Sequence, residues 1–144
     1  MLSTISREYT FSAAHRLEGH PKCGRLHGHN YTVIVEIEGL TDVSGMVLDY
    51  GELDKIVKPA IIDPLDHRYL VSADNIKRND PYATIAVLND HAYILGTAHS
   101  TAEEMSLRMA EAVLSHLGNS CNCVAVTVRE SAKSSARSVV YAQQ

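Results

Sequence analysis

Two stretches near the N-terminus place apolar residues at every second position, the period that is typical of a β-strand with one buried face. The first covers residues 4–15 and is interrupted once, by Arg7, and the second covers residues 29–38. The two faces carry Ile5, Tyr9, Phe11, Ala13 and His15 in the first stretch, and His29, Tyr31, Val33, Val35 and Ile37 in the second. If the strands pair antiparallel, the end of the first meets the start of the second.

Two later segments have the apolar spacing of amphipathic helices. The first is expected to begin at Asp49, an acidic capping residue, and Pro59 is expected to kink it or end it early. The second is expected to begin near Ser100 and Thr101 and to stop at Gly118. Each helix can therefore cover part of an apolar sheet face.

The remaining segments complete an α+β pattern. Residues 82–95 are expected to form an extra hairpin, and residues 121–130 and 136–142 are expected to form the last two strands. We therefore expect a β-β-α-α-β-β order in a single domain, residues 1–144, with a hairpin insertion near residues 80–96. The sheet is expected to be antiparallel with the helices on one face.

Composition narrows the class of protein. The chain has 144 residues, of which 45% are apolar and 21% charged, with a formal charge of -4. These values fit one globular core and give no sign of a nucleic-acid surface. No segment reaches the roughly 18 apolar residues of a membrane span, and the N-terminus does not resemble a signal peptide, so we expect a cytoplasmic protein. Three cysteines close no disulfide framework, and Cys121 and Cys123 alternate on an apolar strand, as small buried residues do.

A cluster of metal-binding residue types lies where the first two strands are expected to meet. His27 and His29 are two apart, so on a strand they point to one face, and strand pairing would bring His15 beside them. Three imidazoles can hold zinc and leave a fourth position open. Cobalt or iron could occupy the same ligands, and a polar cluster without metal is the alternative.

Four other residues are candidates for chemistry, each with a simpler alternative. Cys23 precedes His27 by four residues and could act as a base near the metal, or be a passive thiol in a loop. Asp66 could orient His67 for proton transfer, although neighbours in sequence need not touch. Glu130 ends an apolar strand face and is either a solvated strand end or a carboxylate that accepts two parallel N–H bonds, such as those of a 2-amino-4-oxopteridine.

Together these residues resemble the family of 6-pyruvoyl-tetrahydropterin and 6-carboxy-tetrahydropterin synthases. The resemblance spans nearly the whole chain and implies the tunnelling fold. In that fold the sheets of three subunits join into a barrel, two trimers usually stack, and active sites lie between subunits. The matching segments, in family order, are FSAAH at 11–15, CGRLHGHNY at 23–31, GMVLDY at 45–50, LDH at 65–67, STAE at 100–103 and VRES at 128–131.

The resemblance also implies a role for each candidate residue. The three histidines would hold zinc, and Cys23 would accept a proton, with Asp66 and His67 as its relay. Glu130 would anchor the pterin ring of 7,8-dihydroneopterin triphosphate. Ser100 and Thr101 would lie near that ring. The metal would polarise the hydroxyl groups of the substrate side chain, so that a neighbouring C–H could lose its proton.

Three functions remain open at this point. Three residues separate Cys23 from His27, a gap similar to that of the carboxy-producing enzymes, which serve 7-deazaguanine (queuosine-type) biosynthesis. The pyruvoyl enzymes, which only eliminate triphosphate, generally have a longer gap. A zinc- and pterin-binding oligomer without activity is the third reading. Cations that could receive the triphosphate, or else be solvated surface charges, are Arg16, Lys22, Arg25 and Lys133.

Overall fold

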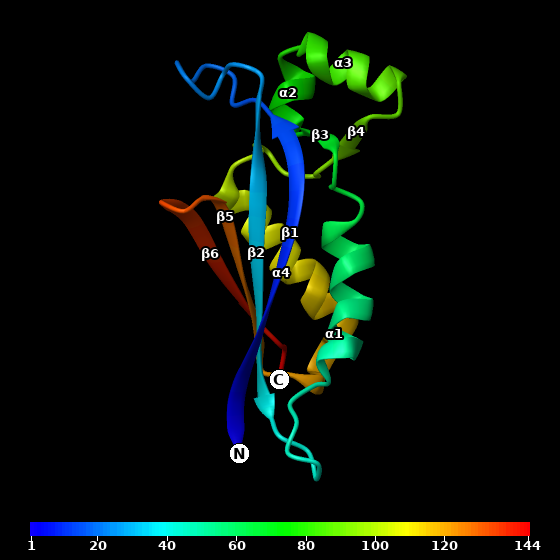
Figure 1. The fold of residues 1–144 in the computed structure, drawn as a ribbon, viewed down its shortest axis with the longest axis vertical. Coiled ribbons are helices and arrows are strands. Elements are labelled where there is room, and N and C mark those ends of the chain that lie inside the picture. The colour runs from blue at the N-terminus through cyan, green and yellow to red at the C-terminus, as the bar shows by residue number, and fades with distance from the viewer.

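One mixed sheet forms the frame of the protein, seen in a computed structural model that describes residues 1–144 (Figure 1). Its strand order is β4-β3-β1-β2-β5-β6. The four long strands pair antiparallel, as predicted, whereas β3 runs parallel to β1 and β4 runs parallel to β3. The strands are β1 (Leu2–His15), β2 (His27–Leu40), β3 (Arg68–Val71), β4 (Ala92–Ile94), β5 (Cys123–Ser131) and β6 (Ser134–Tyr141).

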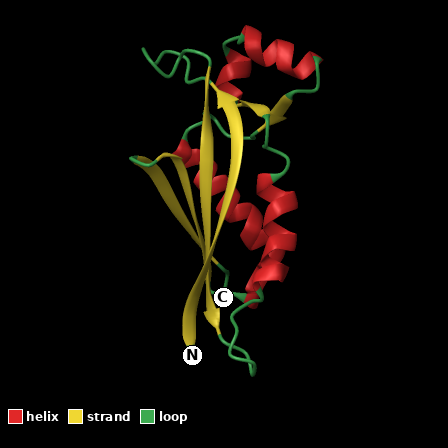
Figure 2. Ribbon diagram, in the orientation of Figure 1, coloured by secondary structure: helices red, strands yellow, loops and turns green.

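Helices α1 (Tyr50–Val57) and α4 (Ala102–Leu117) lie against one face of the long strands, so the predicted α+β class is confirmed (Figure 2). Asp49 caps α1 by accepting hydrogen bonds from the first-turn amides. Pro59 ends the α-helix but not the helical path, because residues Lys58–Ile62 continue as a π-helical turn. Helix α4 ends at Gly118, where a short 3₁₀ turn, Gly118–Ser120, leads to β5.

The hairpin predicted for residues 82–95 is wrong. This stretch forms helix α3 (Pro81–Leu88), preceded by the short helix α2 (Ala73–Lys77), and only β4 within it is extended. Asp80 accepts a hydrogen bond from the Tyr82 amide, and Pro81 occupies the first helical turn, where its missing N–H is harmless. Cap chemistry at Asp80 and Pro81 therefore overrides the β-forming residues that follow.

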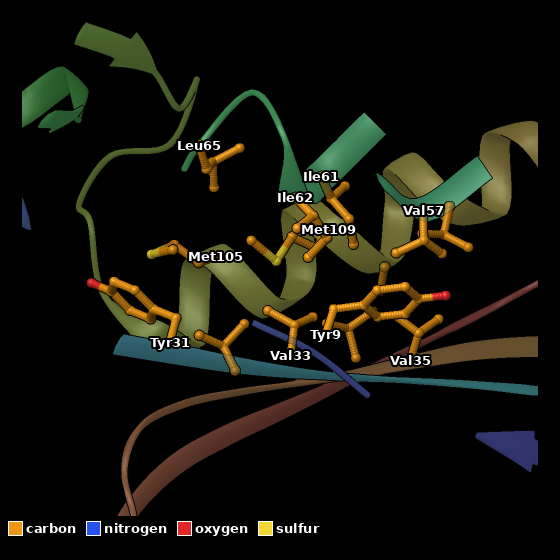
Figure 3. Close-up of a cluster of buried hydrophobic side chains, with 14 of the residues drawn as sticks. Tyr9, Tyr31, Val33, Val35, Val57, Ile61, Ile62, Leu65, Met105 and Met109 are labelled. Carbon is orange, nitrogen blue, oxygen red and sulfur yellow. The ribbon is translucent and has the colours of Figure 1, made fainter. Parts of the chain in front are cut away.

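Two separate apolar cores result from this arrangement. The main core of 23 buried residues lies between the long strands and the helices α1 and α4 (Figure 3). Within it the rings of Phe11 and Tyr31 stack with centroids 4.8 Å apart. Cys121 is buried here as expected, whereas Cys123 is only half-buried. The smaller core joins β3 to α3 and consists of Tyr69, Val71, Ala83 and Ala86.

The helices are all too short or too polar to cross a lipid bilayer.

Candidate metal centre

Three histidines meet at one end of the β1–β2 pair, as the alternation of the two strands predicts. In the register of this pair His15 faces His27, and Ala13 faces His29. The side chains of His15 and His29 come from the face that packs toward the helices, and His27 joins them at the start of β2. One ring nitrogen from each residue lies within 4.8 Å of the others, so the three can share one ion.

Backbone carbonyls fix which nitrogen of two imidazoles can bind a metal. The Nδ1 atom of His15 lies 2.9 Å from the carbonyl oxygen of Ser100 and 3.2 Å from its hydroxyl. The Nδ1 atom of His27 lies 2.7 Å from the carbonyl oxygen of Arg25. A carbonyl can only accept, so Nδ1 carries the proton in both rings and Nε2 offers its lone pair.

Burial favours the neutral form of His15 and His29, the form that a metal requires. Desolvation is the largest cause that lowers the pKa of His15, to about 4, and it also lowers the pKa of His29. The carboxylate of Glu130 acts in the opposite direction on His29. Neutral imidazole is the ligand form, so no proton needs to leave His15 before an ion binds near pH 7.

The spacing of two of the donors matches that of ligands on a tetrahedral ion. The Nε2 atoms of His15 and His29 are 3.2 Å apart. Two nitrogens on a tetrahedral zinc at about 2.0–2.1 Å would be separated by about 3.3 Å. His15 and His29 can therefore share one tetrahedral ion, while His27 offers a third nitrogen within 4.8 Å of theirs. Three histidines with no thiolate leave a fourth position, the arrangement of catalytic rather than structural zinc.

Glu130 and Tyr31 border the histidines. The Oε2 atom of Glu130 lies 4.0 Å from His29 Nε2, and its side chain is about a quarter exposed (24%), so it can still reach a ligand. Tyr31 is fully buried, and its hydroxyl has no hydrogen-bond partner. Desolvation, and secondarily the charge of Glu130, raises the pKa of Tyr31, which stays a neutral phenol. The predicted pterin carboxylate is thus a neighbour of the metal ligands.

Cys23 lies in the loop between β1 and β2, half-buried and outside the group of metal-binding atoms. Its amide donates to Nδ1 of His20 at 2.9 Å, and its carbonyl accepts from the amide of Leu17 at 2.8 Å. The backbone of Cys23 is therefore fixed on both sides, while its thiol stays free of any disulfide.

Asp66 and His67 do touch, because they lie in a turn rather than in a strand. His67 has a positive φ of 60°, which brings its Nδ1 within 2.9 Å of the Asp66 carboxylate. That carboxylate also accepts from the amide of Ser12 in β1, and this bond is the largest cause that lowers the pKa of Asp66. His67 and His29 line the same open groove. Within one chain, no hydrogen bond joins Cys23 to this pair.

Ser100 and Thr101, the two residues expected near the pterin ring, have different contacts. Ser100 is buried and holds the imidazole of His15, as described above. Thr101 caps α4, with its hydroxyl accepting from the amide of Glu104. Among the cations proposed for triphosphate, Arg16 is already paired with Glu18 and Asp80, whereas Lys22, Arg25 and Lys133 are exposed. No local sequence signal could have shown the contact of Ser100 with His15 or that of Arg16 with Asp80, because these partners are distant in sequence.

Comparison with a solved structure identifies the fold. The chain superimposes on 6-pyruvoyl tetrahydropterin synthase from Plasmodium vivax with a TM-score of 0.76, covering 98% of this chain and 99% of the other at 22% identity. The fold is therefore the tunnelling fold of that enzyme.

Sequence comparison then gives the family. Residues 4–139 match the family described as 6-pyruvoyl tetrahydropterin synthase. The chain is 38% identical over 107 residues to 6-carboxy-5,6,7,8-tetrahydropterin synthase of Haemophilus influenzae, covering 71% of this chain and 75% of that protein. It is 32% identical over 136 residues to a putative 6-carboxy-5,6,7,8-tetrahydropterin synthase of Pyrococcus horikoshii, covering 90% and 83%. The chain belongs to the 6-pyruvoyl tetrahydropterin synthase family.

Proposed function

We propose that the protein is a zinc-dependent lyase that converts 7,8-dihydroneopterin triphosphate and water to 6-carboxy-5,6,7,8-tetrahydropterin, acetaldehyde and triphosphate. The observation that carries this proposal is the three-histidine centre, with a fourth ligand position open and Glu130 beside it. A purely structural metal site would have no need of the neighbouring carboxylate or of the free thiol of Cys23. Membership of a family of tetrahydropterin synthases supports the same conclusion.

Each residue has a separate role in the proposed reaction. Zn²⁺, when held by the three histidines, supplies Lewis acidity toward the hydroxyl oxygens of the substrate side chain. Glu130 accepts two N–H bonds from the 2-amino pyrimidine edge of the pterin and so sets the position of the side chain. Cys23 removes a proton from the activated C–H, and Asp66 orients His67 to take that proton onward.

The carboxy product is favoured over the pyruvoyl product by two observations. Only three residues separate Cys23 from His27, and the two relatives described above carry the carboxy name. The alternative is a 6-pyruvoyl-tetrahydropterin synthase that stops after triphosphate elimination. On the favoured reading the product feeds 7-deazaguanine (queuosine-type) biosynthesis in the cytoplasm. A zinc- and pterin-binding oligomer without activity is the weakest reading, because binding needs neither Cys23 nor the pair of Asp66 and His67.

An oligomer would complete the site. Cys23 and the pair of Asp66 and His67 make no contact within one chain, and the side chain of His67 is 82% exposed. We propose that a neighbouring subunit brings its Asp66 and His67 to Cys23 in a homohexamer built from two trimers. Sedimentation of the zinc-loaded protein tests the hexamer directly.

One incubation separates the three functions. Zinc-loaded protein is mixed with 7,8-dihydroneopterin triphosphate, and the products are identified by mass. A carboxy-tetrahydropterin with acetaldehyde supports the proposal, a pyruvoyl product supports the alternative, and unchanged substrate leaves only a binding protein. Cys23→Ala should keep its zinc and lose turnover, whereas the matched Cys123→Ala variant, on β5, should keep both.

A further inference from the structure

We propose that Arg16 and Asp80 form a positioning pair that holds the Cys23 loop in place, and that the α2–α3 segment serves the site by supplying Asp80. This inference rests on the proposed role of Cys23. It also assigns a purpose to the segment that replaces the predicted hairpin, and it removes Arg16 from the candidates for triphosphate binding.

The Cys23 loop, residues 17–24, is a compact turn that is fixed mainly through its backbone. The amide of Gly24 donates to the carbonyl of His20 at 2.9 Å, and the amide of His20 donates to the carbonyl of Leu17 at 3.1 Å. A Cβ atom at Gly24 would lie 2.5 Å from the carbonyl oxygen of His20, so the turn is too tight there for any residue larger than glycine. These bonds shape the loop but do not tie it to the rest of the fold.

Arg16 supplies that tie. Its Nε donates to the carbonyl of Gly24, the residue after Cys23, at 2.7 Å. Its Nη1 donates to Asp80 at 2.8 Å and to Glu18 at 3.0 Å. The planar guanidinium therefore bridges two parts of the fold with separate nitrogens, which a lysine ammonium on a single atom cannot reproduce. The guanidinium also lies over the ring of Tyr82, 5.2 Å from its centroid.

Asp80 makes a rigid anchor because it is buried and fully bonded. Its side chain has no exposed surface, and it accepts from Arg16, from the Tyr82 amide and from the hydroxyl of Tyr69. A buried carboxylate needs such partners, and removing the one positive partner would leave an uncompensated charge. The chain of contacts therefore runs from the small core through Asp80 and Arg16 to the backbone of the Cys23 loop.

The same residues also reach the metal ligands. Arg16 follows His15 directly in sequence, and its carbonyl accepts from Asn75 of α2 and from the hydroxyl of Ser100, each at 3.4 Å. The same set of hydrogen-bonded residues therefore contacts both the histidine cluster and the loop that carries the thiol. Arg16 and Asp80 act through Cys23 and are not expected to touch substrate.

The test variant is Arg16→Lys, which keeps the positive charge beside Asp80 and loses the bond to Gly24. We expect kcat to fall about 10- to 100-fold with KM little changed, because the base is displaced while the pterin pocket is intact. The second readout needs no turnover. Alkylation by iodoacetamide, resolved by mass spectrometry, should become several-fold faster at Cys23 and remain unchanged at Cys121. Zinc content should remain one ion per chain.

Two further variants make the result decisive. Arg7→Lys is the matched control. Arg7, on β1, donates to the carboxylate of Asp54, which also accepts from the hydroxyl of Tyr9. This variant should leave kcat and Cys23 alkylation as in the parent. Asp80→Asn should reproduce the effect of Arg16→Lys. Unchanged Cys23 alkylation in Arg16→Lys would overturn the inference, and so would faster alkylation at Cys121 to the same degree. If the parent has no pterin turnover, the proposed function fails, while alkylation still decides whether the loop is held.

Discussion

Gly28→Ala should weaken zinc binding without removing a ligand. Gly28 lies between His27 and His29 and pairs with Ala14 across the β1–β2 ladder. A Cβ atom at this position would lie 2.9 Å from the carbonyl oxygen of Ala13 and 3.6 Å from the Cα atom of Ala14. Both neighbours are backbone atoms of β1, so no side-chain rotation relieves the contact.

The size of the effect follows from that distance. The strands must separate by about 0.5 Å for the oxygen to reach the ordinary contact limit of 3.4 Å. His15 is on one strand and His27 and His29 are on the other, so the separation moves the ligands apart. Zinc–ligand distances vary by only about 0.2 Å. Changes to the groups that orient metal ligands typically weaken metal binding about 10- to 100-fold, or about 1.4–2.7 kcal/mol, and we expect a loss of this size.

Competition with a chromophoric zinc chelator at pH 7 measures this change. Gly51→Ala is the matched control, since its Cβ meets only the side chain of Asp49, which can rotate, and its Kd should stay within about twofold of the parent. His27→Ala, which removes one ligand, is the reference for lost zinc binding. If Gly28→Ala binds zinc as tightly as the parent while His27→Ala binds none, the argument from strand separation is refuted although the ligands are right.

Three other predictions concern stability. Tyr31→Phe removes a buried hydroxyl that has no hydrogen-bond partner. The free energy of unfolding of the metal-free protein, measured in urea, should therefore rise by about 1 kcal/mol. A fall of that size would show that the hydroxyl is hydrogen-bonded. In metal-free protein, burial lowers the pKa of His15 from 6.5 to about 4, so the unfolded chain takes up the proton first. The free energy of unfolding should therefore fall as the pH drops from 6.5 toward 4, and equal urea midpoints at pH 7 and pH 5 would contradict this. Thr101→Ala removes the hydroxyl that accepts from the amide of Glu104, and so loses about 1 kcal/mol of helix capping. The Tm should fall by about 2–4 °C. An unchanged Tm would show that water replaces the cap.

The sequence predicted the β1–β2 pair and the histidine cluster because both depend on strand alternation. A period of two fixes which residues share a face, and antiparallel pairing then places His15 opposite His27. The start of α4 was also predictable, because capping by Thr101 is a local interaction. These features need no knowledge of distant parts of the chain.

The parts of the structure that the sequence did not predict share one physical cause. The run from Tyr82 to Leu88 is almost wholly apolar, so it has neither a helical nor a strand period, and its state is decided by the cap at Asp80 and by packing on β3. The contact of Ser100 with His15 joins residues far apart in sequence. The bond from Arg16 to Asp80 does the same. Such contacts exist only once the sheet has formed, so local patterns cannot reveal them.

The division of the interior into two cores has a consequence for local unfolding. The core that holds Asp80 in place contains only four buried apolar residues, against 23 in the main core. A small unit with few apolar contacts opens at a lower free energy than the whole protein. Amide hydrogens of β3 and α3 should therefore exchange faster than those of β2 and β5. Each such opening would release Arg16 and loosen the Cys23 loop while the histidine cluster, built on the main core, stays assembled.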